Sequence, residues 1–143
     1  MATNTRALLH HVVSELESAQ FPTWIFGGWA EELQGLSPAR PHSDIDLLYP
    51  APDFNALDKY LAQPSIREIM GKHLPHKRAF SYNDVVIELF LVHPRTLTTN
   101  FWSTTLYQWP SNTLDHPHFP QLASREALLQ YRRDWATIHI AHI

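Results

Sequence analysis

The sequence predicts a single α/β (α+β) domain built from a small mixed β-sheet with flanking helices. Two observations support this prediction. Short apolar runs alternate along the chain with segments of helical periodicity, which indicates the α/β class. Hydrophobic residues make up 44% of the sequence against 17% charged residues, which indicates a globular protein. The length of 143 residues suits one domain with one core. We therefore expect one domain over 1–143, with a core over 1–92 and a short extension, a loop plus a helix, over 93–143.

The first half of the chain alternates helices with strands. Apolar residues recur at helical spacing from Leu8 to Leu16, and Asn4 or Thr5 can cap this helix. An apolar run then ends in Gly27-Gly28, which is typical of a strand followed by a tight turn. The expected elements are a helix over 5–20, a strand over 24–26, a helix over 29–36, a strand over 44–49 and a helix over 53–62.

The second half contains a strand pair, a long irregular stretch and a final helix. Asn83-Asp84 is a plausible hairpin turn between strands over 77–82 and 85–92, whereas 65–74 fits either a helix or a strand. Four prolines make 94–122 irregular, and segments of that length are often functional loops or partner surfaces. Ser124 can cap a helix over 124–141. Its expected core residues are Leu128, Leu129, Trp135 and Ile138.

Composition and charge exclude several classes of protein. The net charge of −3 and the pI of about 6.3 argue against duplex nucleic acid as the main ligand, since such proteins usually present a basic face. The absence of cysteine excludes disulfides, thiolate catalysis and cysteine-based zinc sites. No apolar run approaches the ~20 residues that span a bilayer, and the N-terminus lacks a signal core. We expect a cytoplasmic protein without a membrane partner.

Two acids share one face of a predicted strand. Asp44 and Asp46 are two residues apart, so the period of a strand points both carboxylates the same way, roughly 6–7 Å apart along the chain. Ile45 and Leu47 then point into the core. Such a pair suits Mg²⁺, which prefers oxygen ligands; without a cation the carboxylates repel and one pKa rises.

Glu88 is a third acid, placed inside the otherwise apolar run 85–92. A buried carboxylate is costly unless it meets a cation, either a side chain or a metal. If this strand neighbours the one that carries Asp44 and Asp46, all three acids converge on a site for one or two Mg²⁺ ions and a substrate phosphate. Either element alone is weak evidence, because D-x-D is common and a lone glutamate is more often salt-bridged.

The glycine pair is a candidate phosphate site. Gly27 and Gly28 follow a strand and open a helix, where glycines let the backbone approach a phosphate and the helix N–H groups can bind it. A bare Gly-Gly occurs in many tight turns. Its position ahead of the acidic strand makes the combination more specific.

The order of these motifs resembles a known family. Residues 24–30, W-I-F-G-G-W-A, followed by 40–47, R-P-H-S-D-I-D-L, are similar to the aminoglycoside adenylyltransferase and lincosamide nucleotidyltransferase group of the polymerase-β-like nucleotidyltransferase superfamily. The resemblance is clear over 21–50, extends through 92 and is weak beyond. It implies a nucleotidyltransferase fold, and a Mg²⁺-dependent enzyme that moves a nucleoside monophosphate from ATP or another NTP onto a hydroxyl of a small molecule.

The resemblance also implies roles for matching positions. Gly27 and Gly28 would hold the triphosphate, and Glu88 would complete the acidic trio or take the proton of the acceptor. The implied metal ligands are Asp44, Asp46 and Glu88, and the implied nucleotide-binding residues are Gly27, Gly28, Arg40, His42 and Ser43. For His42, phosphate contact and support of the loop are equally open.

Two departures from the family pattern bear on function. Glu31-Glu32 stands where relatives usually carry an apolar residue and then an acid, so Glu32 is the candidate equivalent and Glu31 is unexplained. The chain after 92 is also short for a second domain that shapes an acceptor pocket. We therefore expect a homodimer whose acceptor pocket draws residues from both chains, with the aromatic-rich segment 100–120 at the interface.

Two alternative functions remain open from the sequence. A minimal nucleotidyltransferase could modify a protein partner, as in toxin–antitoxin pairs. A non-catalytic relative could bind nucleotide without turnover. The complete set of Asp44, Asp46 and Glu88 argues against the second alternative, and the short C-terminal part argues for it.

Overall fold

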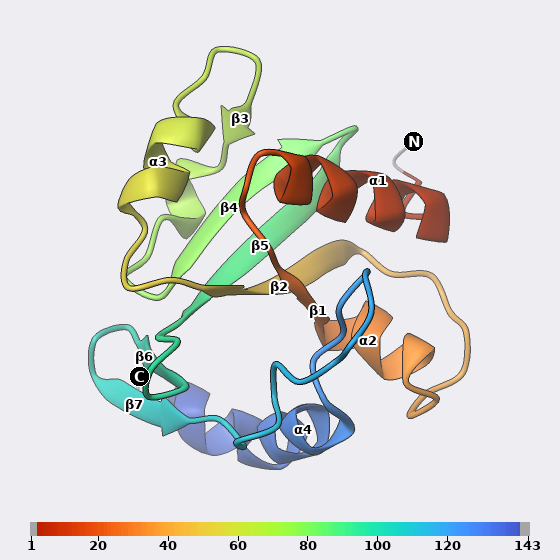
Figure 1. Ribbon diagram of the computed structural model, residues 1–143, viewed down its shortest axis with the longest axis vertical. Coiled ribbons are helices and arrows are strands. Elements are labelled where there is room, and N and C mark those ends of the chain that lie inside the picture. The colour runs from red at the N-terminus through yellow and green to blue at the C-terminus, as the bar shows by residue number, and fades with distance from the viewer. Residues whose placement is uncertain (1–2, 141–143) are drawn as a thin grey trace.

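The computed structural model describes residues 3–140 (Figure 1). Its helices are α1 (Arg6–Ser18), α2 (Gly27–Leu33), α3 (Asn55–Leu61), the 3₁₀ turn η1 (Met70–Lys72) and α4 (Arg125–Ile140). Its strands are β1 (Trp24–Phe26), β2 (Asp44–Pro50), β3 (Arg67–Glu68), β4 (Lys77–Tyr82), β5 (Val85–Val92), β6 (Thr98–Phe101) and β7 (Thr105–Gln108). Within these residues, none of the helices is long and apolar enough to cross a membrane.

A five-stranded mixed sheet organises the domain, in the order β1-β2-β5-β4-β3. The parallel pair β2–β5 lies inside the sheet, and the other neighbours pair antiparallel. The predicted hairpin between β4 and β5 is confirmed. Asn83 and Asp84 both have a positive φ, as a two-residue turn of this kind requires. The mixed sheet with its helices confirms the predicted fold class.

Helix α1 covers one face of the sheet. Thr5 is its cap, because the Leu8 amide donates to the Thr5 hydroxyl over 3.1 Å. Asn4 instead links two other elements, since its amide donates to the Asp44 carbonyl and its oxygen accepts from the Trp29 indole. The apolar face of α1 is buried against the sheet through Leu9, Val12, Val13 and Leu16.

The C-terminal part is more regular than the sequence predicts. Residues 94–122 contain the two-stranded sheet β6–β7, where an irregular stretch was expected. The turn between these strands places Trp102 and Ser103 at positive φ. Glycine or asparagine usually marks such a turn, so the sequence carries no signal for it. The ambiguous segment 65–74 forms β3 and η1.

Helix α4 packs with β6–β7 on the side of the sheet away from α1 (Figure 1). Ser124 caps it as expected, with its hydroxyl accepting from the Ala127 amide; the predicted last residue, Ala141, lies outside the described residues. Leu128 and Ile138 are buried. The prediction that Leu129 and Trp135 belong to the core is wrong. Both are exposed, since the buried stripe of α4 runs through other positions, including Ala127.

Candidate active site

Backbone register builds the site as a row across one face of the sheet. Asp46 of β2 lies beside Phe26 of β1 and beside Glu88 of β5, and Glu88 lies beside Ala79 of β4. Because residues two apart on a strand share a face, Asp44 belongs to this face as well. Its neighbours along β2 point the other way, and Ile45 and Leu47 are fully buried there, as predicted.

The three acids converge. Asp44, Asp46 and Glu88 each offer a carboxylate oxygen, and these oxygens all lie within 4.8 Å of one another. The Ser43 hydroxyl, exposed at the start of β2, hydrogen-bonds to the Asp44 carboxylate. The convergence predicted from strand placement therefore occurs, and it depends on the parallel pairing of β2 with β5.

Two lysines hold the charge of Glu88. Lys72 Nζ lies 2.7 Å from Glu88 Oε2, and Lys77 Nζ lies 3.6 Å from the same oxygen. Burial tends to raise the pKa of Glu88, but the hydrogen bond from Lys72 and the charges of both lysines outweigh it and lower this pKa. The two lysines thus favour the ionised form of Glu88. The buried glutamate, for which the sequence required a cation, meets two of them.

The pKa values of the two aspartates shift in the opposite direction to that of Glu88. Burial, followed by the charges of Asp44 and Glu88 and the close approach of the Glu88 carboxylate, raises the pKa of Asp46 well above its usual range. Burial and the Glu88 charge also raise the pKa of Asp44. Three carboxylates this close cannot all be ionised cheaply without an added cation.

These residues fit a hard divalent cation. The donor set consists of carboxylate oxygens, which Mg²⁺ prefers. Asp46 Oδ1 is buried and has no hydrogen-bond partner among the described residues, so the oxygen is available to a ligand. Asp44, Asp46 and Glu88 are accordingly the residues that would hold Mg²⁺.

Gly27 brings the backbone against the acidic row. It has a positive φ of 64°, and a Cβ placed on it would lie 2.3 Å from Asp46 Oδ2. Only a residue without a side chain permits this approach. Helix α2 begins here, two residues earlier than predicted, because both glycines belong to its first turn.

Gly28 is in close contact with the loop that precedes β2. A Cβ on Gly28 would lie 2.8 Å from His42 Nδ1 and 3.1 Å from Arg40 Nη2. His42 is buried, its Nε2 lies 2.8 Å from Glu32 Oε1, and its ring lies 4.3 Å from that of Trp29. These contacts favour support of the loop as the role of His42. Arg40, in contrast, is exposed.

The two glutamates that depart from the family pattern have separate partners. Glu32 accepts a hydrogen bond from the Arg40 amide and contacts His42. The hydrogen bond with His42 lowers the pKa of Glu32. Glu31 forms an ion pair with Arg132 of α4 at 2.9 Å. Glu32 therefore stabilises the loop that precedes β2, and the Glu31–Arg132 ion pair links α2 to α4.

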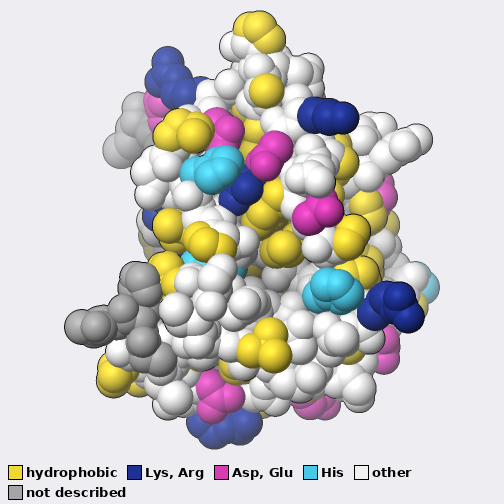
Figure 2. All heavy atoms as spheres, turned by 90° about the vertical axis from the view of Figure 1, so that its left-hand side faces the viewer, with side chains coloured by type: hydrophobic (Ala, Val, Ile, Leu, Met, Phe, Trp, Pro, Cys, Tyr) yellow, Lys and Arg dark blue, Asp and Glu magenta, His cyan; other side chains and the backbone are white. Residues whose placement is uncertain are grey.

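A cavity of about 210 Å³ opens beside the acids, and we call it the acidic cavity. Its lining includes Asp46, Glu88 and Lys77 from the sheet, and Trp102, Tyr131 and Trp135 from the C-terminal part. Figure 2 shows this side of the molecule, where acidic and basic side chains gather around the upper rim of a hollow with hydrophobic side chains inside. The site is thus a cleft between the sheet and the C-terminal part.

A second cavity of about 380 Å³ adjoins the first, and we call it the arginine cavity because Arg40 and Arg132 line it. Gly27 and Trp135 line both cavities, and Gly28 lines the arginine cavity alone. The glycine turn therefore lies at the boundary between the acids and a space large enough for part of a nucleotide.

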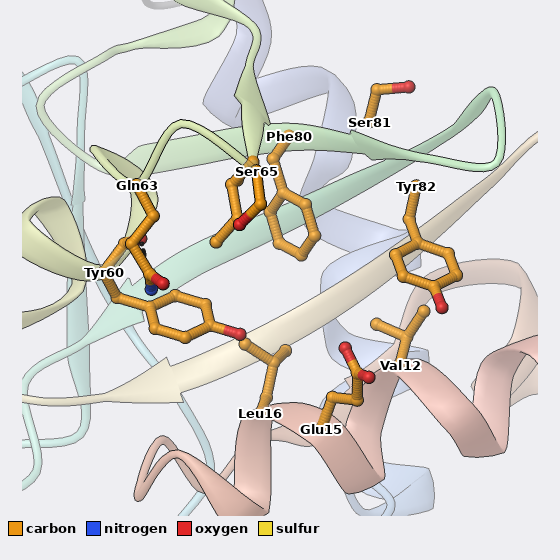
Figure 3. Close-up of a pocket in the computed structure, with 10 residues that line it drawn as sticks. Val12, Glu15, Leu16, Tyr60, Gln63, Ser65, Phe80, Ser81 and Tyr82 are labelled. Atoms are coloured by element: carbon orange, nitrogen blue, oxygen red, sulfur yellow. Dashed lines mark hydrogen bonds between the residues drawn. The ribbon is translucent and has the colours of Figure 1, made fainter.

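A further cavity of about 240 Å³ lies on the other face of the sheet, between α1, the end of α3 and β4 (Figure 3). Tyr60 and Tyr82 flank it, and Glu15 of α1 is the acid among its lining residues. It contains none of the three converging carboxylates. The acidic cleft is therefore the stronger candidate for chemistry.

Sequence reasoning missed several residues of the cleft. The position of Lys77 could have been predicted from the sequence. A two-residue turn at Asn83-Asp84 pairs Ala79 with Glu88, and Lys77, two residues before Ala79, lies on the same face of the sheet. No sequence pattern predicts the position of Lys72, because η1 follows no periodic pattern. Tyr131 reaches the site from α4, where the charges of Asp46 and Glu88, after burial itself, raise its pKa.

Two solved nucleotidyltransferases share this architecture. The lincosamide antibiotic adenylyltransferase LnuA, in its lincomycin-bound crystal structure, superposes with a TM-score of 0.72 over 97% of this chain and 94% of that chain, at 16% identity. ANT(2'')-Ia in complex with adenylyl-2''-tobramycin gives a TM-score of 0.63 over 92% and 75%, at 18% identity. The fold is therefore the nucleotidyltransferase fold, as the resemblance implied.

Sequence comparison gives the family. A profile described as aminoglycoside-2''-adenylyltransferase matches residues 8–100, more than half of the chain, and the chain belongs to this family. Curated 2''-aminoglycoside nucleotidyltransferases from Klebsiella pneumoniae and Escherichia coli are 36% identical to it over 50 residues. That match spans 35% of this chain and 28% of each relative.

Proposed function

We propose that this chain is a Mg²⁺-dependent nucleotidyltransferase that transfers AMP from ATP to a hydroxyl group of a small molecule. The observation that carries the proposal is the convergence of Asp44, Asp46 and Glu88 beside Gly27. Membership of the aminoglycoside-2''-adenylyltransferase family supports the reaction class and a role in antibiotic resistance. Candidate acceptors are antibiotics of the aminoglycoside and lincosamide types, by analogy with the relatives.

Each site residue has a role in this proposal. The carboxylates of Asp44, Asp46 and Glu88 would hold one or two Mg²⁺ ions. Gly27 and Gly28 would admit the phosphates at the boundary of the two cavities, and Arg40 lies where it could pair with them. Ser43 and His42 act through neighbours, by contact with Asp44 and with Gly28 respectively.

The proposed reaction is an in-line displacement at phosphorus. The acceptor oxygen forms a bond to the α-phosphorus, the bond from that phosphorus to the bridging oxygen breaks, and pyrophosphate leaves. Bound Mg²⁺ would neutralise charge on the phosphate oxygens and lower the pKa of the acceptor hydroxyl. Glu88 adjoins the acidic cavity beside the two aspartates, so it is proposed either to take the hydroxyl proton or to hold the Mg²⁺ ion nearer the acceptor.

The single chain has a second wall to its cleft. The sequence suggested a homodimer because the part after 92 offered little material for such a wall. Strands β6–β7 and helix α4 provide it, and Phe101, Tyr107 and Trp109 are buried there as part of the one hydrophobic core of the domain. The homodimer stays a prediction, and light scattering at micromolar concentration is its direct test.

The alternative functions are less favoured. Family membership and the complete acidic cluster both support catalysis on a small molecule. An enzyme that consumes ATP fits the cytoplasmic location that the sequence predicts. The short C-terminal part argued for a non-catalytic role, but β6, β7 and α4 give the cleft a second wall, and no observation favours a protein acceptor.

Turnover by the isolated chain tests the proposal. The protein is incubated with ATP and MgCl₂ over a panel of hydroxylated antibiotics, while pyrophosphate and acceptor mass are measured. We expect equal amounts of pyrophosphate and adenylylated acceptor, lost on addition of EDTA. ATP binding without Mg²⁺ dependence, or pyrophosphate release that is equal in wild type and Asp46→Asn, would contradict the proposal.

A further inference from the structure

Three aromatic rings line the cavity on the face of the sheet opposite the acids (Figure 3). Tyr60 belongs to α3, and Phe80 and Tyr82 belong to β4. Because residues two apart on a strand share a face, Phe80 and Tyr82 point the same way, whereas Ala79, which pairs with Glu88, points toward the acids. The three rings enclose a hollow of about 240 Å³, which we call the aromatic cavity.

Contacts from outside the cavity fix the two tyrosine rings. The Tyr60 ring packs on Phe21 with a centroid separation of 5.1 Å, and the Tyr82 ring packs on His11 at 5.4 Å. Neither Phe21 nor His11 lines the cavity, so both contacts lie behind the rings. Phe80 is buried in the core. The cavity is therefore preformed, and a ligand would lose little free energy in ordering its walls.

The charge of the aromatic cavity comes from Glu15 of α1. Neither a lysine nor an arginine is among the described residues that line it. Figure 3 shows the Glu15 carboxylate between the rings of Tyr60 and Tyr82. Burial, followed by the charge of Glu15, raises the pKa of Tyr60, in agreement with this approach.

Glu15 has one ion-pair partner among the described residues. His11 Nε2 lies 3.3 Å from Glu15 Oε1, one helical turn away, and both side chains are about half exposed. An exposed ion pair of this kind contributes little free energy, and this one requires a protonated histidine. A cation in the cavity would therefore compete only with a weak contact for the carboxylate.

This combination of groups suits an organic cation. The faces of aromatic rings carry negative charge density and attract a cation within about 6 Å of the ring centre. An alkylated ammonium group brings apolar methyl groups to the rings and has few N–H groups, or none, to satisfy in an apolar hollow. An anion would be repelled by Glu15, and a neutral apolar ligand would gain nothing from its charge.

We propose that the aromatic cavity binds a small organic cation with an alkylated ammonium group, its charge beside Glu15 and its methyl groups against Tyr60, Phe80 and Tyr82. This is a second ligand site, separated from the acidic cleft by the sheet. It goes beyond the proposed nucleotidyltransferase function and does not depend on it.

A pair of probes that differ in charge alone tests the proposal. The isotopically labelled full chain is titrated with choline chloride and with 3,3-dimethylbutan-1-ol, in which carbon replaces the charged nitrogen, at constant ionic strength. Amide chemical shifts give both the affinity and the location. We expect choline to bind at least about tenfold more tightly than the alcohol, with the largest shifts over residues 12–16, 60–66 and 80–82.

Substitutions separate the charge from the rings. Glu15→Gln and Tyr82→Leu should each weaken choline binding by about fivefold or more, whereas Tyr82→Phe keeps the ring and should bind choline as the wild type does. Glu17→Gln is the matched control, because Glu17 lies on the same helix but does not line the cavity. Circular dichroism establishes that each variant is folded.

Three results would overturn the proposal. The first is no saturable choline binding at millimolar concentration, or equal affinity for choline and the alcohol. The second is a set of shifts centred on Asp44, Asp46 and Glu88, which would place choline in the acidic cleft. The third is unchanged choline affinity in folded Glu15→Gln and Tyr82→Leu. None of these results bears on Mg·ATP binding, so the nucleotidyltransferase proposal is tested separately.

Discussion

The two faces of strands β2 and β5 differ sharply, although alternate residues of the same two segments form them. Toward α1, Ile45, Leu47, Ile87 and Leu89 are all 0% exposed and join the core. Toward α4, Asp44, Asp46 and Glu88 crowd their carboxylates within 4.8 Å. One face thus stabilises the fold through apolar burial, and the other concentrates like charges that oppose folding.

This contrast shows how a small domain can hold three carboxylates close together. A rigid apolar layer fixes the backbone of both strands, so the acids behind it cannot move apart to relieve their repulsion. Active sites commonly store strain that the rest of the fold offsets. The comparison predicts that substitutions on the apolar face change stability, whereas substitutions on the acidic face change ligand binding.

The largest effect on stability is expected on the apolar face. Leu47→Ala should lower the free energy of unfolding by about 2–5 kcal/mol, because it removes a fully buried side chain and leaves a cavity. Urea denaturation measures this loss. Mg·ATP affinity at low temperature, where the variant stays folded, should be unchanged. A selective loss of affinity in the folded variant would mean that the faces are not independent.

On the acidic face, the expected effect is on ligand binding. Asp46→Asn should reduce Mg·ATP affinity or turnover by more than about a hundredfold, because loss of a residue that merely supports a metal ligand already costs 10–100-fold. Calorimetry and pyrophosphate release measure it. Gln63→Ala, in the cavity of the opposite face, is a suitable control. Equal Mg·ATP affinity in Asp46→Asn and wild type would remove Asp46 from the site.

A substitution at Gly27 should change both stability and ligand binding, and Gly35 offers a matched control. Both glycines have positive φ, 64° and 75°, but a Cβ on Gly35 would meet nothing within 4 Å. Gly35→Ala should therefore cost only the backbone strain, about 1–2 kcal/mol. Gly27→Ala should cost more and also weaken Mg·ATP binding, since its Cβ displaces Asp46. Equal losses in the two variants would show that the approach to Asp46 has no consequence.

The smallest expected effect is a change in pH dependence without metal. A carboxyl whose folded pKa is raised binds its proton more tightly in the folded state, so stability falls as pH rises from its unfolded pKa through its folded pKa. Asp46 is such a group, whereas Glu88, with its lowered pKa, acts oppositely and loses its contribution as pH falls.

The Asp46→Asn variant isolates the contribution of Asp46 to the pH dependence of stability. In EDTA at neutral pH it should melt at a slightly higher temperature than the wild type, and this advantage should shrink toward acidic pH and on addition of MgCl₂ to the wild type. Thermal unfolding by circular dichroism measures it. A variant less stable than the wild type at neutral pH without metal would refute the repulsion argument.

Local sequence patterns were sufficient to predict much of the fold and to predict which acids share one face of a strand. The alternation of Asp44, Ile45, Asp46 and Leu47 fixes which side chains share a face, because the period of a strand is two. The turn at Asn83-Asp84 sets the β4–β5 hairpin, and Thr5 and Ser124 mark helix starts that the structure confirms. These features depend on neighbours in the chain, so the sequence alone determines them.

Only the tertiary structure decided how distant segments meet. The parallel register that sets Asp46 beside Glu88, the reach of Lys72 to Glu88 and the arrival of Tyr131 from α4 join residues far apart in sequence. The β6–β7 hairpin likewise turns at Trp102 and Ser103, whose positive φ no local propensity favours. Such contacts arise from the sum of many packing interactions across the domain, which no periodicity within one segment encodes.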